Sequence, residues 1–232
     1  MEYLHWDEQT ITDFSEKNIS DMYNRGYVFT RKGKGVMQQT RSVRIDLKKF
    51  ELSSENRRIL KKVESVQVQS EKLPLKEYDI RIGKSAKDFY GEKFGPGIMS
   101  AQKVKEMLAE PEKSNYNLLM RYIIYGITTR EASPDPALGW TIAYENPSLV
   151  HYSYPFYDLK AAPKDMGLGM MTKAIDWAKT NGKKYIYLGS LQRPSDTYKL
   201  QFEGLEWFDK DKGWQTNLDE VKKILASAKM TE

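Results

Sequence analysis

The chain has 232 residues, of which 40% are hydrophobic and 30% are charged, a balance that predicts a folded protein rather than a disordered one. It contains no cysteine, and its two histidines lie far apart in sequence, so disulfides, thiolate metal sites and a cysteine nucleophile are excluded and no metal site is expected. The net charge of +5 is uneven: residues 25–62 hold twelve Lys or Arg against three acids, a local balance of +9 that leaves −4 elsewhere. So dense a basic block is typical of proteins that bind nucleic acid, although a lysine-rich solvated surface would give the same count.

The N-terminus is acidic and lacks the features of a signal peptide, and no apolar run reaches the length needed to span a bilayer. These observations predict a cytoplasmic protein. Neither an internal repeat nor a linker-like segment divides the chain, so we expect a single unit over residues 1–232. Within it, residues 1–70 would form a basic N-terminal portion packed on a catalytic half at residues 71–232.

Apolar periodicity and capping residues predict most of the helices and strands. In the first third of the chain we expect a helix over residues 12–25, a hairpin tip at 31–35, a strand at 40–47 and a helix at 55–62. Strands at 63–69 and 78–82 and helices within 84–96 and 100–109 should follow. Strands at 118–125 and 139–144 would be joined by a loop at 132–136, and a last helix would run from a capping box at 217–220 to about residue 228.

The stretch around residues 139–208 is the most informative. An aromatic, apolar run over residues 139–157 predicts strands, residues 170–180 follow helical spacing, and residues 185–188 predict a buried strand. Strand, helix, strand is a βαβ unit. In the turn before the helix, Gly167 and Gly169 would lie at the helix N-terminus, where backbone N–H groups favour an anion. The two glycines could equally serve only to make a tight turn.

Lys164, Gly167 and Gly169 resemble the pyrophosphate loop of the GNAT N-acetyltransferases, Gln/Arg-x-x-Gly-x-Gly/Ala, with lysine at the position where glutamine or arginine is usual. The βαβ pattern is consistent with the same fold. We therefore expect an α+β protein with a GNAT-like mixed, mostly antiparallel sheet flanked by helices and a central βαβ unit.

Further segments resemble the arginyl-tRNA–protein transferases, a family that includes bacterial leucyl-transferring relatives. Phe50-Glu-Leu-Ser-Ser-Glu-Asn-Arg-Arg-Ile-Leu-Lys-Lys62 resembles the family's Phe-x-Pro-Ser-x-x-x-Arg-Arg-x-Leu-Lys segment. Tyr185-Ile-Tyr-Leu-Gly189 and Tyr198-Lys-Leu-Gln-Phe202 resemble its Tyr-Leu-Gly and Tyr-Lys-x-x-Phe pair, and residues 21–27 resemble its helix-ending Arg-Gly-aromatic element. Two departures are the absence of the family's cysteine cluster and Leu52 in place of proline.

The resemblance implies transfer of an amino acid from aminoacyl-tRNA to the N-terminal amine of a protein, which marks that protein for degradation through the N-degron pathway. Aminolysis of an ester needs positioning, oxyanion stabilisation and proton transfer, and it needs no cofactor or nucleophilic side chain. The expected partners are an aminoacyl-tRNA and an acceptor protein N-terminus, with no membrane. The resemblance favours arginine slightly as donor, whereas the aromatic strands before the glycine turn would suit leucine.

Candidate residues follow from the motifs. Tyr198 would donate to the leaving ribose hydroxyl, Gln201 would orient the ester, and Asp158 or Glu203 would act as base for the incoming amine. The candidates for substrate binding are Lys164, Gly167, Gly169, Lys199, Trp140 and Tyr144, and those for tRNA binding are Arg57, Arg58, Lys61 and Lys62. Core packing would also explain the aromatic residues, and an exposed basic helix face would explain the four cations.

Two alternative functions remain open at this level. In an acetyl-CoA-dependent N-acetyltransferase, Lys164, Gly167 and Gly169 would bind pyrophosphate and Tyr198 would protonate the thiolate of coenzyme A. In a non-catalytic RNA-binding module, the basic block would persist without the chemistry. The N-acetyltransferase does not need the basic block, whereas the aminoacyl transferase uses it.

Overall fold

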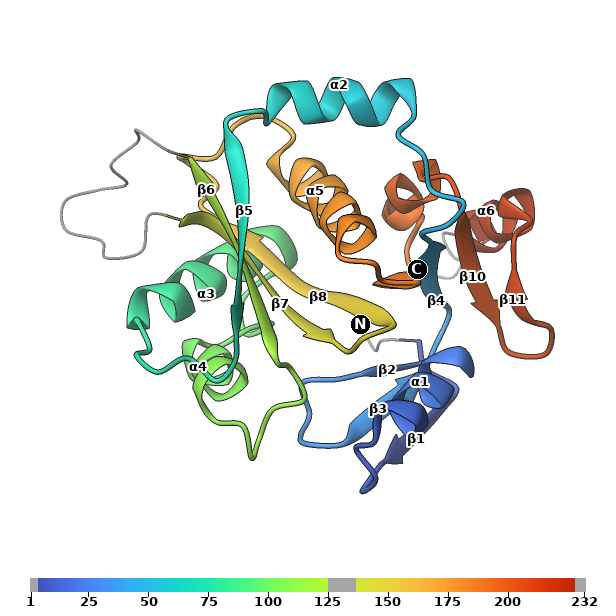
Figure 1. The fold of residues 1–232 in the computed structure, drawn as a ribbon, viewed down its shortest axis with the longest axis horizontal. Coiled ribbons are helices and arrows are strands. Elements are labelled where there is room, and N and C mark those ends of the chain that lie inside the picture. Colours follow the sequence, from blue (N-terminus) through green and yellow to red (C-terminus); the bar gives the residue numbers. More distant parts are fainter. Residues whose placement is uncertain (1–3, 125–136, 228–232) are drawn as a thin grey trace. The chain divides into compact units, whose positions relative to one another are not determined.

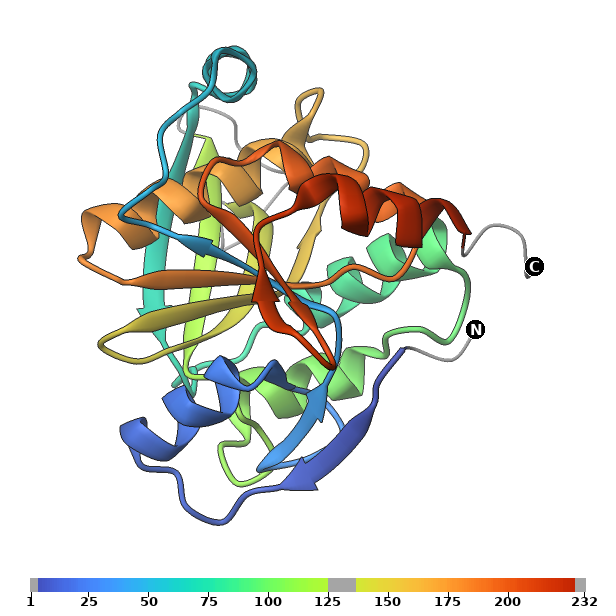
Figure 2. The same ribbon diagram turned by 90° about the vertical axis from the view of Figure 1, so that its right-hand side faces the viewer.

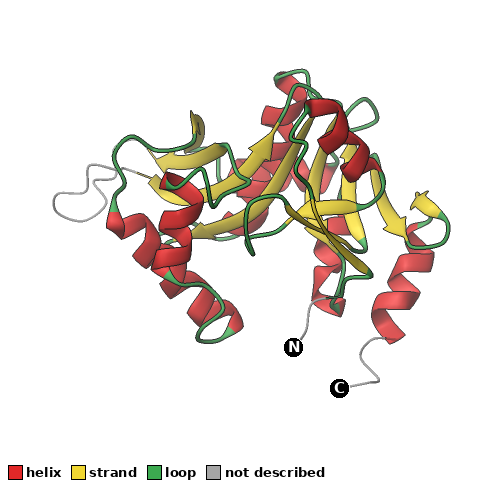
Figure 3. Cartoon of the chain, turned by 90° about the horizontal axis from the view of Figure 1, so that it is seen from below, coloured by secondary structure: helices red, strands yellow, loops and turns green. Residues whose placement is uncertain are grey.

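The computed structural model describes residues 4–124 and 137–227 and divides the chain into two compact units. Unit 1 comprises Met1–Ser53, Asn146–His151 and Ala178–Glu232, and unit 2 comprises Ser54–Glu145 and Tyr152–Trp177. Each unit is therefore discontinuous in sequence, and each combines helices with strands. Figure 3 marks the helices and strands of the described residues. Among the helices of the described residues, none is long and apolar enough to cross a membrane.

A small antiparallel sheet lies in unit 1. Its strands are β1 (Asp7–Thr10), β3 (Val36–Gln39) and β2 (Tyr27–Phe29), in that order. Helix α1 (Glu16–Asn24) separates β1 from β2 in sequence and begins after Ser15, whose hydroxyl accepts a hydrogen bond from Asn18 N. The predicted hairpin tip at residues 31–35 connects β2 and β3.

The larger sheet of unit 1 carries the segment that follows the βαβ unit. From one edge its strands are β11 (Gly213–Gln215), β10 (Leu205–Asp209), β4 (Ser42–Asp46), β9 (Tyr185–Ser190) and the first residues of β8 (Leu149–Tyr157). The pairs β10–β11, β4–β10 and β4–β9 are antiparallel, whereas β8 and β9 are parallel. The 3₁₀ helix η1 (Pro194–Gln201) connects β9 to β10.

Helix α6 (Leu218–Ser227) lies beside the β10–β11 hairpin (Figures 1 and 2). It contributes Val221 and Leu225 to an apolar cluster with Leu200 of η1 and Trp207 of β10. Each of these side chains is at most 8% exposed. This cluster fixes η1 against the sheet, and η1 carries three of the candidate residues.

Unit 2 contains an antiparallel sheet of β5 (Val66–Lys72), β6 (Leu118–Ile124) and β7 (Ala137–Glu145), together with the remainder of β8. Its helices are α2 (Ser54–Lys62), α3 (Ile80–Phe94), α4 (Ala101–Ala109) and most of α5 (Met166–Thr180). Helix α5 approaches β7 closely at Gly139, where an added Cβ would lie 2.9 Å from Met170 Sδ. The hydroxyl of Tyr122 on β6 donates to the Met170 carbonyl at 3.2 Å, which fixes the start of α5 against this sheet.

The predicted fold class is confirmed. The strands pair in a mixed, mostly antiparallel pattern with helices on each unit, and β8, α5 and β9 form the expected βαβ unit with parallel strands.

One predicted element has the wrong type. Residues 78–82 alternate like a strand, yet Asp79 is the N-cap of α3 and its carboxylate accepts from Arg81 N at 2.9 Å. A five-residue alternation fits a strand and a helix start equally well, and the capping hydrogen bond favours the helix. Strand β5 also begins at Val66 rather than residue 63, because Val63 still bonds to Ile59 O at the end of α2. The predicted loop at 132–136 lies outside the described residues.

Candidate functional site

The glycine turn lies within the first turn of α5. The helix begins at Met166 after Asp165, which has a positive φ of 64° and whose carbonyl accepts from Gly169 N at 2.9 Å. A Cβ at position 169 would lie 2.7 Å from Val63 Cγ2, so close packing against Val63 requires glycine there. A Cβ at position 167 would make an ordinary 3.4 Å contact with the Tyr157 ring. Packing therefore explains Gly169 and leaves Gly167 unexplained.

The start of α5 already has a negative charge. The Asp165 carboxylate accepts a hydrogen bond from the Lys62 ammonium, and this hydrogen bond holds the pKa of Asp165 below its usual range. Lys164, which precedes it, is exposed. Because an anion favours a helix N-terminus, the aspartate carboxylate stabilises this end of α5 in the way a bound phosphate would.

The four candidate cations of α2 lie on an exposed face, opposite the buried Ile59. Arg58 pairs with Glu55 one turn earlier, at 2.5 and 2.7 Å, while Lys62 pairs with Asp165. Arg57 and Lys61 are also exposed. At least two of the four cations are therefore engaged within unit 2, and a phosphate would have to compete for them.

The other candidates lie in η1 of unit 1, directly after β9. The entry to η1 is fixed by Asp196, whose Oδ2 accepts from the backbone N–H groups of Gln192 and Arg193, each at 2.9 Å, and Pro194 opens the helix. Such a cap orders the first turn of a short helix that has few hydrogen bonds of its own. These hydrogen bonds fix the start of the helix that carries residues 198–201.

Tyr198 is suited to donate a proton. Its side chain is 45% exposed, so it is accessible to a ligand. Burial around the hydroxyl, with a smaller effect of the Asp196 charge, raises the pKa of Tyr198 to about 12. The hydroxyl is therefore protonated throughout the physiological pH range.

Lys199, the next residue, is buried, whereas Tyr198 is partly exposed. It is only 8% exposed, and its ammonium donates to the carbonyl of Ser190 at the end of β9, at 2.8 Å. The same ammonium lies 5.8 Å from the centroid of the Tyr198 ring. Burial lowers the pKa of Lys199. The sequence motif indicated this residue without indicating that it is buried.

Gln201 closes η1 and borders a pocket. Its Nε2 donates to the Tyr198 carbonyl at 2.6 Å, and the pocket beside it has a volume of about 370 Å³. Lys49, Glu203 and Glu206 supply the charged groups of this pocket. The predicted site thus contains a tyrosine hydroxyl, a buried amine and an amide within four consecutive residues, next to a cavity in the same unit.

Two of the segments that resemble the transferase family meet in unit 1. Phe50, from the first segment, lies 6.4 Å from Phe202, which ends the Tyr-Lys-x-x-Phe segment, measured between ring centroids. Both rings are buried, at 1% and 2% exposure. Although 152 positions separate them in sequence, these residues form one contact, and Phe202 thereby anchors the C-terminal end of η1.

The remaining candidates belong to unit 2. The Asp158 carboxylate accepts from Lys160 N and Ala161 N, at 2.8 and 3.1 Å, and so forms a local turn after β8. Trp140 and Tyr144 on β7 are 6% and 7% exposed, and Trp140 stacks on Phe156 with ring centroids 5.4 Å apart. A base role for Asp158 and an adenine contact for the two aromatic residues stay predictions.

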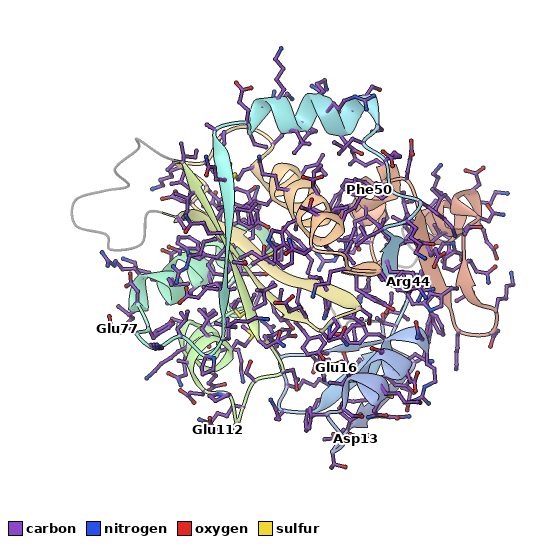
Figure 4. The ribbon with its side chains drawn as sticks, viewed as in Figure 1. Asp13, Glu16, Arg44, Phe50, Glu77 and Glu112 are labelled. Carbon is purple, nitrogen blue, oxygen red and sulfur yellow. The ribbon has the colours of Figure 1, made fainter. Side chains whose placement is uncertain are left out.

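Sequence reasoning missed a buried charged group, Arg44 on β4 (Figure 4). Its Nε donates to Glu206 Oε2 at 2.8 Å and its Nη1 to Asn24 Oδ1 at 3.1 Å. The guanidinium also lies 4.0 Å from the Tyr185 ring centroid and 3.9 Å from that of Trp214. A lone arginine within an apolar strand was the available signal. Because Glu206 borders the pocket, this cluster supports the pocket's wall.

A second buried group that the sequence did not reveal is the pair of His151 on β8 and Tyr23 on α1. His151 Nδ1 lies 2.9 Å from the Tyr23 hydroxyl, and the two side chains are 2% and 0% exposed. Burial lowers the pKa of His151 to about 3. The imidazole is therefore neutral in the folded protein at any pH near neutrality.

This pair predicts a specific loss of stability in acid. The unfolded chain protonates His151 near pH 6.5 and the folded protein only near pH 3, so the unfolded state binds more protons between these values. From pH 6.5 downward the free energy of unfolding should fall by up to about 1.4 kcal/mol per pH unit on account of this residue. Urea unfolding at pH 7.5, 5.5 and 4.5 measures it. We expect His151→Gln to have a shallower pH dependence than the wild type, whereas His5→Gln, at the only other histidine, keeps the wild-type slope; equal slopes for all three proteins would contradict the prediction.

No protein-family model matches the chain, and none of the curated proteins compared with it is similar enough to match. Solved structures do match. The structure of L-PGS from Bacillus licheniformis aligns with a TM-score of 0.46 and 14% identity over 76% of this chain, which spans about half, 51%, of that one. The C-terminal domain (DUF2156) of a putative lysylphosphatidylglycerol synthetase from Agrobacterium fabrum gives 0.44 and 11% over 92% of this chain and 70% of that one.

A GCN5-related glucosamine N-acetyltransferase region of a fungal multi-domain β-N-acetylglucosaminidase gives a TM-score of 0.43 and 9% identity, over 85% of this chain and 22% of that one. With TM-scores below 0.5 and identities of 14% or less, none of these three likenesses assigns an activity to the chain.

Proposed function

We propose that the protein is an aminoacyl-tRNA–protein transferase, which passes arginine or leucine from a charged tRNA to the N-terminal amine of an acceptor protein and so marks it for degradation. The observation that carries this proposal is the η1 segment: Tyr198 is a partly exposed proton donor, Lys199 a buried amine, and Gln201 borders a pocket. The resemblance of this segment to the Tyr-Lys-x-x-Phe motif supports it. A charged tRNA is a cytoplasmic substrate, so the proposal places the protein in the cytoplasm.

These groups suit aminolysis of an activated ester. The ester needs no nucleophilic side chain, because the acceptor amine attacks the carbonyl itself. Tyr198, neutral below about pH 12, would protonate the ribose oxygen as it leaves. Gln201, held by its hydrogen bond to the Tyr198 carbonyl, would orient the aminoacyl group in the pocket. No cofactor enters this reaction.

One observation weighs against the acetyl-CoA alternative. A pyrophosphate at the start of α5 would meet the Asp165 carboxylate, whose lowered pKa keeps it charged. Like charges at one helix terminus repel, and displacement of Asp165 would also break its ion pair with Lys62. Aminoacyl transfer requires no pyrophosphate at the start of α5.

A single assay separates the candidate functions. The full chain is incubated with arginyl-tRNA, leucyl-tRNA or acetyl-CoA and peptides of different N-termini, with N-terminally acetylated peptides as the matched control. Transfer of arginine or leucine to free but not acetylated N-termini supports the proposal and identifies the donor. Acetyl transfer without aminoacyl transfer would replace it with an N-acetyltransferase, and tRNA binding without any transfer would leave an RNA-binding module.

The exposed cations of α2 give a prediction for tRNA binding. If they contact phosphates, replacing all four with alanine should weaken tRNA binding and lower the slope of log affinity against log salt by up to about four, because each phosphate contact releases about one counterion. Arg58 and Lys62 already have carboxylate partners, so the decrease should fall below that limit. Nitrocellulose filter binding between 50 and 300 mM salt, roughly the range in which such contacts dominate, measures the slope.

The control carries the same change in charge at other exposed positions of the chain. Alanine replaces four lysines near or within α6: Lys210, Lys212, Lys222 and Lys223. This control should keep the wild-type slope, and exposed ion pairs contribute too little for either variant to unfold. Equal slopes for the wild type and the α2 variant would place the tRNA on another surface.

A further inference from the structure

The Lys199 side chain is buried and forms no ion pair in the part of the chain that the structure describes. Its only hydrogen bond in the described part of the chain goes to the Ser190 carbonyl, although an ammonium has three N–H donors. Asp196, the acid whose charge acts on Lys199, has its Oδ2 committed to the backbone of Gln192 and Arg193. A buried charge that lacks a partner is costly. Among the described residues no carboxylate forms an ion pair with this amine, so the amine has hydrogen-bonding capacity left for a negatively charged group.

The amine lies beyond the end of a parallel strand, a position at which α/β sheets commonly bind ligands. Ser190 is the last residue of β9, a member of the parallel pair β8–β9, and ligands of α/β sheets bind beyond the carboxyl ends of parallel strands. Gly189 has a φ of +79°, and a Cβ there would stand 4.0 Å from Lys199 Nζ. The positive φ, which side chains with a Cβ rarely adopt, explains glycine at this position next to the amine. Tyr198 adjoins it with an accessible ring.

We propose that the Lys199 ammonium stabilises the oxyanion that forms when the acceptor amine attacks the aminoacyl ester; this inference rests on the function proposed above. The nitrogen lone pair forms a bond to the carbonyl carbon, and the C=O π pair moves to the carbonyl oxygen, which accepts a hydrogen bond from Lys199. When the tetrahedral intermediate collapses, the carbon–oxygen bond to ribose breaks. The ribose oxygen takes a proton from Tyr198, and Tyr198 regains one from the attacking nitrogen.

The buried charge is what distinguishes this role from a structural one. A neutral donor could equally hold the Ser190 carbonyl, and removing a buried charge that forms no ion pair relieves the cost of its desolvation. A group that meets its partner only in the transition state lowers the barrier without tightening substrate binding. Lys199 should therefore contribute to kcat and little to KM or to stability.

Two substitutions test this in transfer assays. Lys199→Met and Lys199→Cys should lower kcat by about 10²- to 10³-fold, as the loss of an oxyanion donor does, while KM changes by less than roughly threefold. The melting temperature of Lys199→Met should equal or exceed that of the wild type. A kcat within threefold of the wild type, or a parallel loss of kcat and folded protein, would overturn the proposal.

The absence of cysteine from the chain permits a sharper control. In the K199C variant the introduced thiol is the only thiol of the chain, so it is the only thiol to which 2-bromoethylamine can attach an aminoethyl group. This group restores an amine of lysine's length, whereas 2-bromoethanol attaches a neutral group of the same length. Recovery of kcat by at least tenfold with the amine and not with the alcohol supports the oxyanion role. Equal recovery with both would show that the side chain acts through packing.

A binding experiment separates failure of this inference from failure of the proposed function. The probes are adenosine 3′-esters of the phosphonate analogues of arginine and leucine, which carry the negative charge of the tetrahedral intermediate, and the uncharged 3′-aminoacylamino-adenosines. The wild type should bind the better phosphonate at least tenfold more tightly than Lys199→Met does, and both proteins should bind the amide equally. If the wild type transfers nothing but shows this difference, the proposed function fails and the oxyanion site stands. If the difference is absent, the inference fails whatever the activity.

Discussion

Tyr198→Phe is expected to lower kcat for aminoacyl transfer by about 10²- to 10⁴-fold, the contribution of a positioned proton donor. The ring is retained, so its 45% exposed surface and the fold of η1 should persist. What is lost is a hydroxyl whose pKa of about 12 keeps it protonated at neutral pH. Single-turnover transfer from charged tRNA to a peptide, followed with a labelled amino acid, measures the effect on the chemical step without product release.

The matched control is Thr197→Val, one residue earlier in η1. It also removes a hydroxyl, one that donates to the Pro194 carbonyl at 2.9 Å within the helix itself. We expect this control to keep activity within a few-fold of the wild type. A Tyr198→Phe enzyme as active as Thr197→Val would show that the leaving ribose oxygen takes its proton from another group, with the rest of the site unaffected.

Arg44→Met is expected to destabilise the protein by about 3–5 kcal/mol, because removing one partner of a buried ion pair leaves the other charge uncompensated. Arg44 and Glu206 are 7% and 8% exposed, and the guanidinium also serves Asn24 and the Tyr187 hydroxyl. Lys49, 3.4 Å from Glu206 Oε1, would neutralise part of the remaining charge and keep the loss toward the lower value. Urea unfolding monitored by tryptophan fluorescence measures the change.

Arg58→Met is the control, since it breaks an ion pair with the same chemistry at an exposed position. It should cost less than about 1 kcal/mol. The double variant Arg44→Met, Glu206→Gln should recover part of the loss, because no buried carboxylate then lacks its partner. A loss below 1 kcal/mol for Arg44→Met, equal to that of the exposed pair, would mean that water reaches the cluster.

The sequence predicted helix caps and buried strands correctly, because these features depend on residues close together in the chain. Ser100 caps α4 by accepting from Lys103 N at 3.0 Å, and Asn217 caps α6 by accepting from Asp219 N and Glu220 N, as their spacing predicted. The strands β6 and β7 pair as expected because their apolar residues are buried. Capping and burial patterns extend over only a few residues, so the sequence alone reveals them.

The features that determine the site depend on residues far apart in sequence. Lys62 and Asp165 are 103 positions apart and Arg44 and Glu206 are 162 apart, so no local pattern indicates that they form ion pairs. For Lys199 the motif marked the position, but its burial depends on β9 and on the packing of η1. Residues 78–82 show the same limitation on a short scale, since only the observed cap distinguishes a helix from a strand there.

Strand β4 is translated long before the two strands that it pairs with, so the order of synthesis affects how the chain folds. This strand pairs with β9 and β10, which begin at residues 185 and 205, while unit 2 is complete at residue 177. At 5–20 residues per second, β4 would wait roughly ten to thirty seconds for β10 to be translated. During that time both edges of β4 can pair with strands of other chains, so this segment is prone to association until β9 and β10 are translated. Helix η1, and with it the Lys199 amine, can acquire its native environment only after α6, which packs against it, has left the ribosome.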